Sequence, residues 1–276
     1  MFYAQSVEHL RWFIDERYAI FLRKEAGEPK PWTNDSILQQ YRFCNVFRED
    51  DAVTRWAHNN WGRTYAGYRN LWFAMAAARI FNNPDCLADL GCPLPTYDPE
   101  KYLRVLRQRE AMNKRRYGAA YMITATHKEI RSGEMTKDEF ICRRVLGGIW
   151  GKTPPRDTLE SFCWWLAAQE GFGSFLAAQV VADIKHFGEW RKAPDWWTFA
   201  ASGPGSRRGL NRVCGRPVNA PWKEEEWKAT LDELHEHIYE VGGRQLDAQN
   251  LQNCLCEFDK YERARLGEGR PKQRYN

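Results

Sequence analysis

The apolar residues of this chain recur mostly at intervals of three and four, which is the spacing of an α-helix. One such run covers residues 7–18 and another covers residues 71–81. The alternation of apolar and polar residues that marks a β-strand is rare. The pattern therefore predicts an all-α protein.

Clusters of Pro and Gly interrupt the helical pattern and mark connections between helices. They fall at residues 27–31, 82–84, 91–99, 152–155 and 203–205. No internal repeat is visible, so we expect a single domain over residues 1–276, built of two tightly joined lobes with a seam near residues 152–155. The Gly-, Lys- and Arg-rich residues 265–276 predict a loose basic tail.

The composition, with 43% hydrophobic and 28% charged residues, is that of an ordinary globular protein and excludes extensive disorder. No run approaches the roughly 18 apolar residues of a membrane-spanning helix. The first residues lack the pattern of a signal peptide, so we expect a cytoplasmic protein. The eight cysteines have neither the spacing of a zinc site nor that of an iron–sulfur loop, so we expect reduced thiols and no metal site.

Positive charge is concentrated in the middle of the chain. The net charge is +5, but residues 101–150 contain 12 Lys or Arg and only 5 Asp or Glu. The 13 Trp, 12 Tyr and 14 Phe residues supply side chains that can stack on bases. Together these features favour a nucleic-acid partner. A solvated helix face is the alternative explanation of the basic segment.

Residues 146–153 end in Gly-Lys-Thr, like the phosphate-binding loop of nucleotide triphosphatases. That loop requires a glycine five residues before the Gly-Lys pair, and Leu146 occupies this position. Pro154 and Pro155 follow where the helix after the loop should begin. The sequence therefore argues against an NTPase.

Two short helices joined by a glycine turn are predicted in the second half of the chain. Residues 159–169 and 174–186 have helical patterns, and Gly171 and Gly173 lie between them. Two glycines permit a tight turn, and the amides that open the second helix at Ser174 can hold a DNA phosphate. We therefore assign Gly171, Gly173 and Ser174 to the DNA backbone, with an ordinary αα-hairpin as the alternative.

Asp195 lies 24 residues after Gly171. This layout resembles the helix-hairpin-helix DNA glycosylases, in which an essential Asp follows the hairpin at a similar distance. The resemblance concerns the layout only, because the local residues differ. It implies a two-lobed helical fold like that of the glycosylases, with a catalytic role for Asp195.

A third segment carries arginines, aromatic residues and an asparagine close together. We predict a helix over residues 37–48, with its N-cap among residues 34–36. On such a helix Tyr41, Asn45 and Arg48 share one face. The alternative is an amphipathic helix with a charged outer face.

This third segment resembles the signature of the phage α-glutamyl/putrescinyl thymine pyrophosphorylases, which are amino acid:DNA transferases, and of the related helical domain of 5-hydroxymethyluracil DNA kinases. Residues 203–212 and 253–263 also resemble that family. With the glycine hairpin, four motifs match in order and span most of the chain. Without a phosphate-binding loop, the resemblance favours a stand-alone transferase over a kinase fusion.

The resemblance implies a reaction on double-stranded phage DNA in the cytoplasm of an infected bacterium. A separate DNA kinase first supplies a uracil that carries a pyrophosphorylated 5-hydroxymethyl group. A free amino acid or polyamine then displaces pyrophosphate while the base is held outside the stack. The leaving group makes Mg²⁺ a candidate cofactor. The sequence does not identify the amine.

The candidate site residues follow from the needs of this reaction. The leaving pyrophosphate needs cations, the extruded base needs aromatic and polar walls, and the amine needs a proton acceptor. We assign the cationic role to Arg42, Arg48, Arg207, Arg208, Arg212 and Lys260, the base pocket to Tyr41, Phe43, Asn45 and Trp196, and catalysis to Asp195 and Glu257. Surface charge is the alternative for the arginines, and a helix ion pair is the alternative for Glu257.

Two other functions stay open from the sequence. One is a DNA glycosylase that excises a modified base with Asp195. The other is a non-catalytic DNA-binding module that works with a 5-hydroxymethyluracil DNA kinase. Abasic sites would identify the glycosylase, and DNA that stays chemically unchanged with every amine would identify the module.

Overall fold

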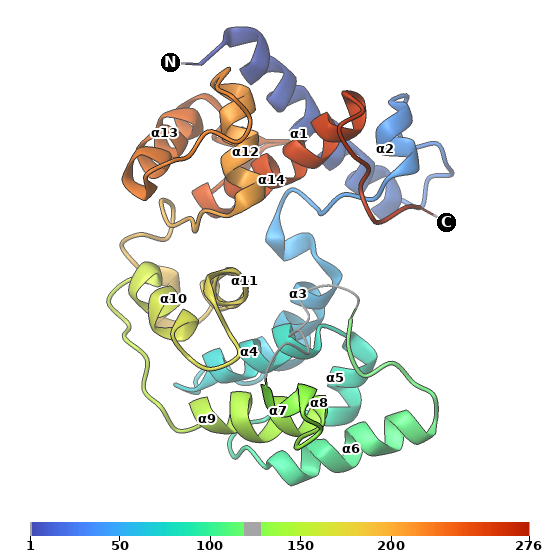
Figure 1. Ribbon diagram of the computed structural model, residues 1–276, viewed down its shortest axis with the longest axis vertical. Coiled ribbons are helices and arrows are strands. Elements are labelled where there is room, and N and C mark those ends of the chain that lie inside the picture. The colour runs from blue at the N-terminus through green and yellow to red at the C-terminus, as the bar shows by residue number, and fades with distance from the viewer. Residues whose placement is uncertain (1, 119–127, 276) are drawn as a thin grey trace. The chain divides into compact units, whose positions relative to one another are not determined.

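The computed structural model describes residues 2–118 and 128–275. The chain divides into two compact units, Met1–Asp51 with Trp197–Asn276, and Ala52–Trp196. Regular structure in the described residues is helical, apart from one short antiparallel hairpin of β1 (Glu240–Val241) and β2 (Arg244–Gln245) (Figure 1). The all-α prediction is therefore confirmed.

The division into units does not follow the expected seam, because residues 152–155 lie inside the second unit. The chain enters that unit at Ala52 and leaves it at Trp196. Both ends of the chain therefore build the first unit, and the second unit is one continuous segment. Local sequence patterns do not reveal such an arrangement, because it depends on contacts between distant segments.

The first unit is built around four longer helices. Its elements are α1 (Ala4–Glu25), α2 (Ser36–Gln40), the 3₁₀ turn η1 (Arg48–Asp50), α12 (Pro204–Val213), α13 (Glu224–His237) and α14 (Ala248–Arg265). Phe13, Trp227 and Phe258 lie in the hydrophobic core that these helices enclose. The predicted helix over residues 7–18 is part of α1.

Helix α12 packs closely on α14 because it carries two glycines. A Cβ at position 209 would lie 2.1 Å from the carbonyl oxygen of Leu255, and a Cβ at position 205 would lie 2.5 Å from the Sγ of Cys256. Pro204 occupies the first turn of α12, where its missing N–H has no cost. The Gly-Pro-Gly sequence thus starts α12 and allows α14 to pack closely against it.

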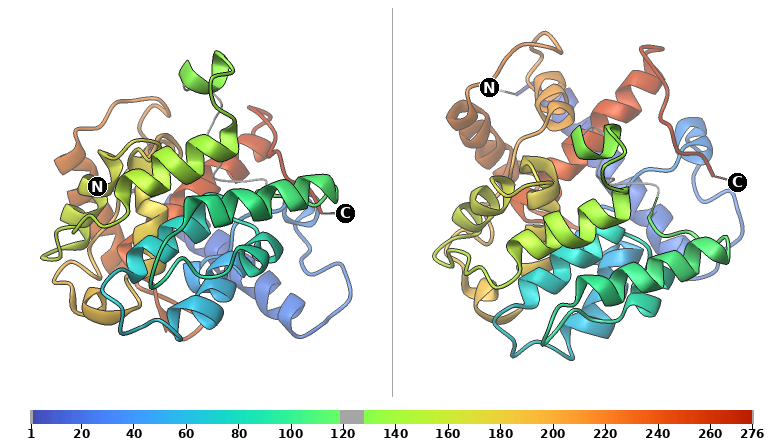
Figure 2. Two further views of the ribbon diagram at one scale, coloured as in Figure 1. Left: turned by 90° about the horizontal axis from the view of Figure 1, so that it is seen from below. Right: turned by 60° about the horizontal axis from the view of Figure 1, so that its bottom comes forward.

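The second unit contains the remaining elements. They are α3 (Ala52–Ala57), η2 (His58–Gly62), α4 (Leu71–Phe81), α5 (Pro84–Leu90), α6 (Pro99–Ala111), α7 (Lys128–Arg131), α8 (Lys137–Glu139), η3 (Phe140–Leu146), α9 (Gly147–Ile149), α10 (Leu159–Ala167), α11 (Ser174–Ile184) and the 3₁₀ turn η4 (Gly188–Lys192). Helices α8, η3 and α9 follow one another without a break, and α6 lies beside η3 (Figure 2). Because residues 140–149 are helical, no strand leads into the Gly-Lys-Thr sequence.

The predicted glycine hairpin is confirmed as α10 and α11. The turn between them contains Gly171 at φ +85° and Gly173 at φ +87°. These backbone angles favour glycine over any residue with a Cβ. A Cβ at Gly171 would also lie 2.4 Å from a methyl group of Val145, so the hairpin packs directly against η3.

The predicted helix over residues 37–48 is wrong beyond Gln40, where α2 ends. Asp35 caps this short helix by accepting a hydrogen bond from the amide of Leu38. Further along, the amide of Cys44 donates to Glu257 and the amide of Arg48 donates to Asn250. The backbone between α2 and η1 therefore finds its partners on α14 instead of within a helix.

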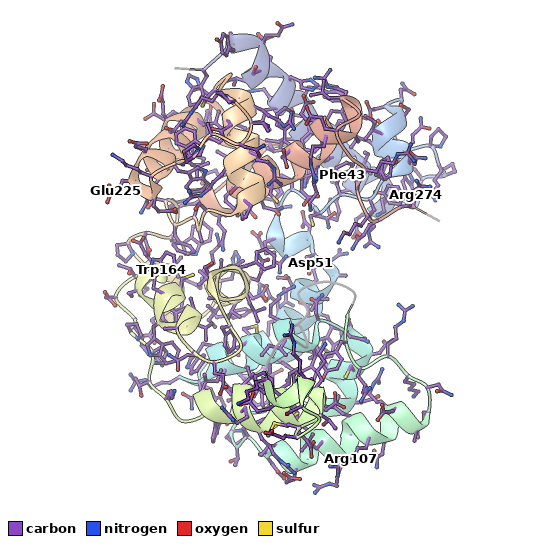
Figure 3. All side chains as sticks on the ribbon, viewed as in Figure 1. Phe43, Asp51, Arg107, Trp164, Glu225 and Arg274 are labelled. Atoms are coloured by element: carbon purple, nitrogen blue, oxygen red, sulfur yellow. The ribbon has the colours of Figure 1, made fainter. Side chains whose placement is uncertain are left out.

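The C-terminal tail, which was expected to be loose, is held against the first unit by its backbone. The amide of Arg42 donates to the carbonyl of Gln273, and the amide of Tyr275 donates to the carbonyl of Gln40. Tyr41 and Arg274 form an isolated antiparallel bridge. Phe43 and Arg274 lie in the same part of this unit (Figure 3). The tail is therefore a structural part of the segment that follows α2.

A buried ion pair lies at the centre of the second unit. Asp183 on α11 and Arg79 on α4 are both fully buried. The guanidinium donates to both carboxylate oxygens of Asp183 at 2.8 Å. It also donates to the hydroxyl of Thr54, which donates in turn to Asp183. This network joins α3, α4 and α11.

In the part of the chain that the structure describes, no helix is long and apolar enough to cross a membrane.

Candidate functional site

Three arginines surround one fully buried carboxylate, Asp259, in the first unit. Asp259 accepts hydrogen bonds from the Nε of Arg208 at 2.8 Å and from the Nε of Arg212 at 3.2 Å. The Nε of Arg263 lies 3.4 Å from the same carboxylate. Arg208 stays 30% exposed, and Arg212 also pairs with Glu268 at the surface. We call Arg208, Arg212, Asp259 and Arg263 the Asp259 cluster, and it brings two of the predicted pyrophosphate ligands together.

Arg207 belongs to a different group of contacts, although it is adjacent to Arg208 in sequence. Its guanidinium pairs with Glu224 and donates to the Oγ of Ser202 at 3.0 Å and to the carbonyl of Trp222 at 2.8 Å. It therefore ties α12 to the start of α13. Neighbouring residues on a helix point in directions about 100° apart, so a run of arginines does not by itself make one site.

Glu257 on α14 is buried and both of its oxygens are engaged. Oε1 pairs with the Nζ of Lys260, and Oε2 accepts the amide of Cys44 at 3.2 Å. The charge of Glu257 is the largest influence on the pKa of the Cys44 thiol, which is raised to about 12. Burial is the largest single influence on the pKa of Lys260 and lowers it, but the charge and hydrogen bond of Glu257 together with the nearby Cys44 and Cys256 outweigh burial and raise that pKa. Glu257 thus anchors Lys260 and the segment after α2.

A row of polar side chains on α14 holds this segment along its length. Asn250 accepts the amide of Arg48 at 3.0 Å, and the side-chain amide of Asn253 donates to the carbonyl of Asn45 at 3.3 Å. The predicted residues Asn45, Arg48, Glu257 and Lys260 therefore come together through α14. They do so through an extended backbone, and the predicted shared helix face does not exist.

A cavity of about 590 Å³ opens beside the Asp259 cluster in the first unit. Arg212 and Arg265 line it together with His9 and Glu262, and Phe258 contributes an apolar wall. No histidine is among the candidate site residues that the sequence predicts. His9 and Glu262 are separated by 253 residues, so no local motif could have indicated their contact.

His9 and Glu262 form a hydrogen-bonded pair in this cavity. The Nε2 of His9 lies 3.0 Å from Oε1 of Glu262. Burial raises the pKa of Glu262, but hydrogen bonds from Arg265 and His9 outweigh burial and hold it below its ordinary value. An ionised carboxylate only accepts, so Nε2 carries the hydrogen and the Nδ1 of a neutral His9 has a free lone pair. The pair thus has the arrangement of a base and its orienting carboxylate.

The predicted base-pocket aromatics are packed against other side chains. Tyr41 is buried beneath the guanidinium of Arg274, which lies 5.4 Å from its ring. Phe43 packs edge-on against Phe13, with ring centres 5.8 Å apart. Trp196 belongs to the second unit, where its indole N–H donates to the carbonyl of Lys185 at 2.9 Å. None of the three lines the cavity at His9.

Asp195, predicted as a catalytic carboxylate, lies at the start of α10 in the second unit. Its two oxygens accept the amides of Leu159 and Glu160 at 2.8 and 2.9 Å. Thr158 caps the same helix by accepting the amide of Ser161. Asp195 therefore satisfies amides that have no partner within the helix and complements the positive end of the helix dipole.

The start of α11 differs from that of α10. Its N-cap is Gly173, which has no side chain to accept a hydrogen bond from the first turn. The neighbouring Phe175 is 62% exposed, so this end of the helix faces solvent. Amides at a helix N-terminus can bind phosphate. The contact of Gly171, Gly173 and Ser174 with a DNA backbone stays a prediction.

Ion pairs occupy much of the basic segment between residues 101 and 150. Arg109 contacts Asp89, Arg116 contacts Glu110 and Asp138, Arg143 contacts Glu100, and Arg144 contacts Glu170. Lys114, Arg115, Lys128 and Arg131 are exposed, with no ion pair to any other described residue. These four cations are the better candidates for contacts with DNA phosphates.

Across residues 2–118 and 128–275, no three His, Cys, Asp or Glu side chains are grouped so that they could hold a metal ion.

Comparison with known proteins connects this geometry to a family. A family model for the helical domain of 5-hmdU DNA kinase matches residues 4–270. The 5-hmdU DNA kinase of Bacillus phage SP10 is 25% identical over 278 residues, a match that covers 89% of this chain and 43% of that kinase. This chain thus spans less than half the length of that relative, and no solved structure matches it. The chain belongs to the family of 5-hmdU DNA kinase helical domains.

Proposed function

We propose that this protein modifies thymine-derived bases in phage DNA by replacing the pyrophosphate of 5-pyrophosphoryloxymethyluracil with an amine. The observation that carries this proposal is the cavity at His9. There, two arginines and a histidine–carboxylate pair face the same space. Cations for a leaving pyrophosphate and a base for an incoming amine are the two components that the reaction needs.

The leaving group is the first requirement of this chemistry. As the amine nitrogen bonds to the exocyclic carbon, the carbon–oxygen bond breaks and its electron pair leaves with pyrophosphate. Arg212 is held by Asp259 on one side and lines the cavity on the other. A guanidinium fixed in this way stabilises the growing negative charge without reorganising. Arg208 contributes by sharing Asp259 with Arg212, which is held on its other side by Glu268.

The proton of the amine is the second requirement. Once the carbon–nitrogen bond has formed, the nitrogen carries one proton too many, and the Nδ1 of His9 accepts it. Glu262 then faces an imidazolium and stabilises its charge. This assignment replaces Glu257 as the base, because both Glu257 oxygens already hold partners. It also leaves Asp195 with its observed contacts at the start of α10.

The test is mass spectrometry of nucleosides from DNA that carries pyrophosphorylated 5-hydroxymethyluracil, after incubation with the protein and a mixture of amino acids and polyamines. We expect a new amine-substituted nucleoside and released pyrophosphate. His9→Gln should lower the yield of this nucleoside, whereas the matched variant His237→Gln, at an exposed histidine of the same unit, should not. A new nucleoside formed equally well by both variants would refute the role of His9.

A second candidate is the DNA-holding module, and one observation favours it. The matched region is only 43% of the SP10 kinase, so in that relative it accompanies a longer remainder of the chain. The same experiment separates the two functions. The module leaves every nucleoside unchanged while binding DNA, and a glycosylase would leave abasic sites.

A further inference from the structure

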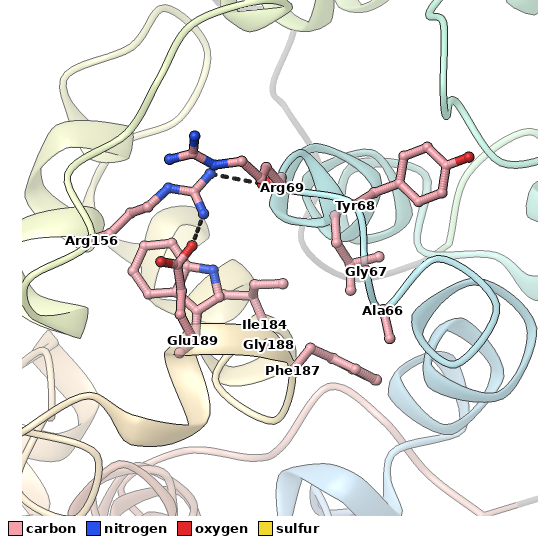
Figure 4. Close-up of a pocket in the computed structure, with 11 residues that line it drawn as sticks. Ala66, Gly67, Tyr68, Arg69, Arg156, Ile184, Phe187, Gly188 and Glu189 are labelled. Carbon is pink, nitrogen blue, oxygen red and sulfur yellow. Dashed lines mark hydrogen bonds and ion pairs between the residues drawn. The ribbon is translucent and has the colours of Figure 1, made fainter.

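A second cavity, entirely within the second unit, has the composition of a nucleotide site. Its volume is about 330 Å³, which falls within the range of small-molecule pockets. Loop residues 66–69 form one wall, and the end of α11 with η4 forms another (Figure 4). Gly188, at the start of η4, has a φ of +51°, which favours glycine.

Two guanidinium groups lie beside each other at this cavity, those of Arg69 and Arg156 (Figure 4). Arg156 is only 14% exposed, and it donates to the carbonyl of Arg69 at 2.8 Å and pairs with Glu189. Its Nε is buried without a partner among the described residues. Burial and the neighbouring charge of Arg69 both lower the pKa of Arg156. Adjacent like charges of this kind are relieved by an anion.

The negative charge already present does not balance these cations. Glu189 is the only carboxylate among the described residues that line the cavity, and its side chain is 50% exposed. The Arg69 side chain is exposed, with no ion pair to another described residue. A doubly charged phosphate would accept hydrogen bonds from both guanidiniums, which are well suited to bidentate contacts.

The rest of the cavity is apolar and aromatic. Ile184, Phe187 and Trp190 line it, and Tyr68 lies at its rim with 46% of its surface exposed. Phe187 is fixed edge-on by His58, with ring centres 4.7 Å apart. A planar heterocycle can pack against the apolar side chains of Ile184 and Phe187. A cationic end and an apolar end in one small cavity match a phosphate joined to a base.

We propose that this cavity binds one nucleotide unit, with its phosphate at Arg69 and Arg156 and its base against Ile184 and Phe187. The unit can come from a free nucleotide or from a nucleotide of a DNA strand, because both present the same chemistry. This proposal goes beyond the transferase function and does not depend on it. Binding is measured without turnover, so failure of amine transfer leaves it standing.

The test is isothermal titration calorimetry of the full chain with deoxythymidine monophosphate, thymidine, and a short oligothymidylate. We expect the monophosphate to bind and thymidine to bind more weakly. Arg69→Gln should weaken monophosphate binding roughly tenfold or more, since it removes a charged hydrogen bond. Arg63→Gln, at an exposed arginine outside the cavity, is the matched control and should leave the affinity within about twofold.

Each result of these titrations either supports the proposed site or overturns it. Binding of the oligonucleotide but not of the monophosphate, with the same dependence on Arg69, assigns the site to a DNA strand. Equal affinity for thymidine and its monophosphate would overturn the phosphate assignment. If neither the monophosphate nor the oligonucleotide binds, or if Arg69→Gln and Arg63→Gln behave alike, the proposal fails. Unchanged thermal unfolding of Arg69→Gln verifies that the variant is folded.

Discussion

The two units each contain a fully buried aspartate bonded to arginine, but the two groups are built differently. Asp183 in the second unit meets one arginine, Arg79, and both side chains are enclosed. Asp259 in the first unit meets three arginines, and Arg208 and Arg263 remain about one-third exposed. The first arrangement is a closed ion pair, and the second is an open array of cations.

This difference separates a structural role from a binding role for the same residue types. A closed pair has no donor left over for a ligand, and its burial makes each partner depend on the other. An open array keeps guanidinium donors at the surface, held in place by the buried carboxylate. Arg212 belongs to such an array and lines the cavity at His9. Several arginines that share one buried carboxylate therefore indicate a candidate binding site more specifically than the number of arginines in a sequence segment does.

The largest expected effect comes from breaking the closed pair. Arg79→Met should lower the free energy of unfolding by about 3–5 kcal/mol, because it leaves a buried carboxylate without its cation. Urea denaturation followed by circular dichroism measures this change. The double variant Arg79→Met with Asp183→Leu removes both charges and should recover much of the loss. A single variant as stable as the parent protein would show that the pair is not structural.

The next largest effect concerns the open array. Arg208→Ala should lower formation of the amine-substituted nucleoside, because Arg208 shares the Asp259 carboxylate with Arg212, which lines the cavity. Arg208→Lys should fall between Ala and the parent, because it keeps the charge but loses the planar fork. Unfolding should change by less than about 1 kcal/mol, since Asp259 keeps two arginines. Arg270→Ala, an exposed arginine of the same unit, is the control; equal activity of the Arg208 and Arg270 variants would contradict the comparison.

A third carboxylate, Asp195, differs from Asp183 and Asp259 because it accepts hydrogen bonds from backbone amides instead of arginines. If Asp195 caps α10, Asp195→Asn should cost about 0.5–2 kcal/mol of stability, in the range of lost helix caps. Its residual activity should then respond to pH like that of the parent. Partial rescue of the variant at high pH would instead show that Asp195 takes the proton of the amine. Thermal unfolding and a pH series of nucleoside yields separate the two roles.

The smallest expected effect concerns cations outside both centres. Replacing Lys114, Arg115, Lys128 and Arg131 with Gln should weaken DNA binding and flatten its salt dependence, by roughly 0.9 in slope for each lost phosphate contact. Fluorescence anisotropy at several salt concentrations gives this slope. Replacing Arg143 and Arg144, which are already paired with carboxylates, should change the slope less. Identical slopes for the two sets of variants would show that the basic segment is a solvated helix face that does not bind DNA.

The sequence by itself determined the elements whose signals are local. Helical periodicity indicated α1 and α4, and the paired glycines indicated the turn between α10 and α11, because only glycine adopts its positive φ angles readily. The position of Gly203-Pro204-Gly205 likewise indicated the start of α12. The resemblance to the helical domain of 5-hydroxymethyluracil DNA kinases was also present in the sequence, and the family match over residues 4–270 confirms it. The resemblance to the thymine pyrophosphorylases stays a prediction.

Tertiary structure decided everything that depends on residues far apart in the chain. The segment after α2 has helical periodicity, yet α14 supplies the side chains that take its amides, so the backbone stays extended. The periodicity reports only which residues are apolar, and it contains nothing about competing partners 200 residues away. The contact of His9 with Glu262 and the gathering of arginines at Asp259 have the same origin. Such sites exist only after both ends of the chain have packed into one unit.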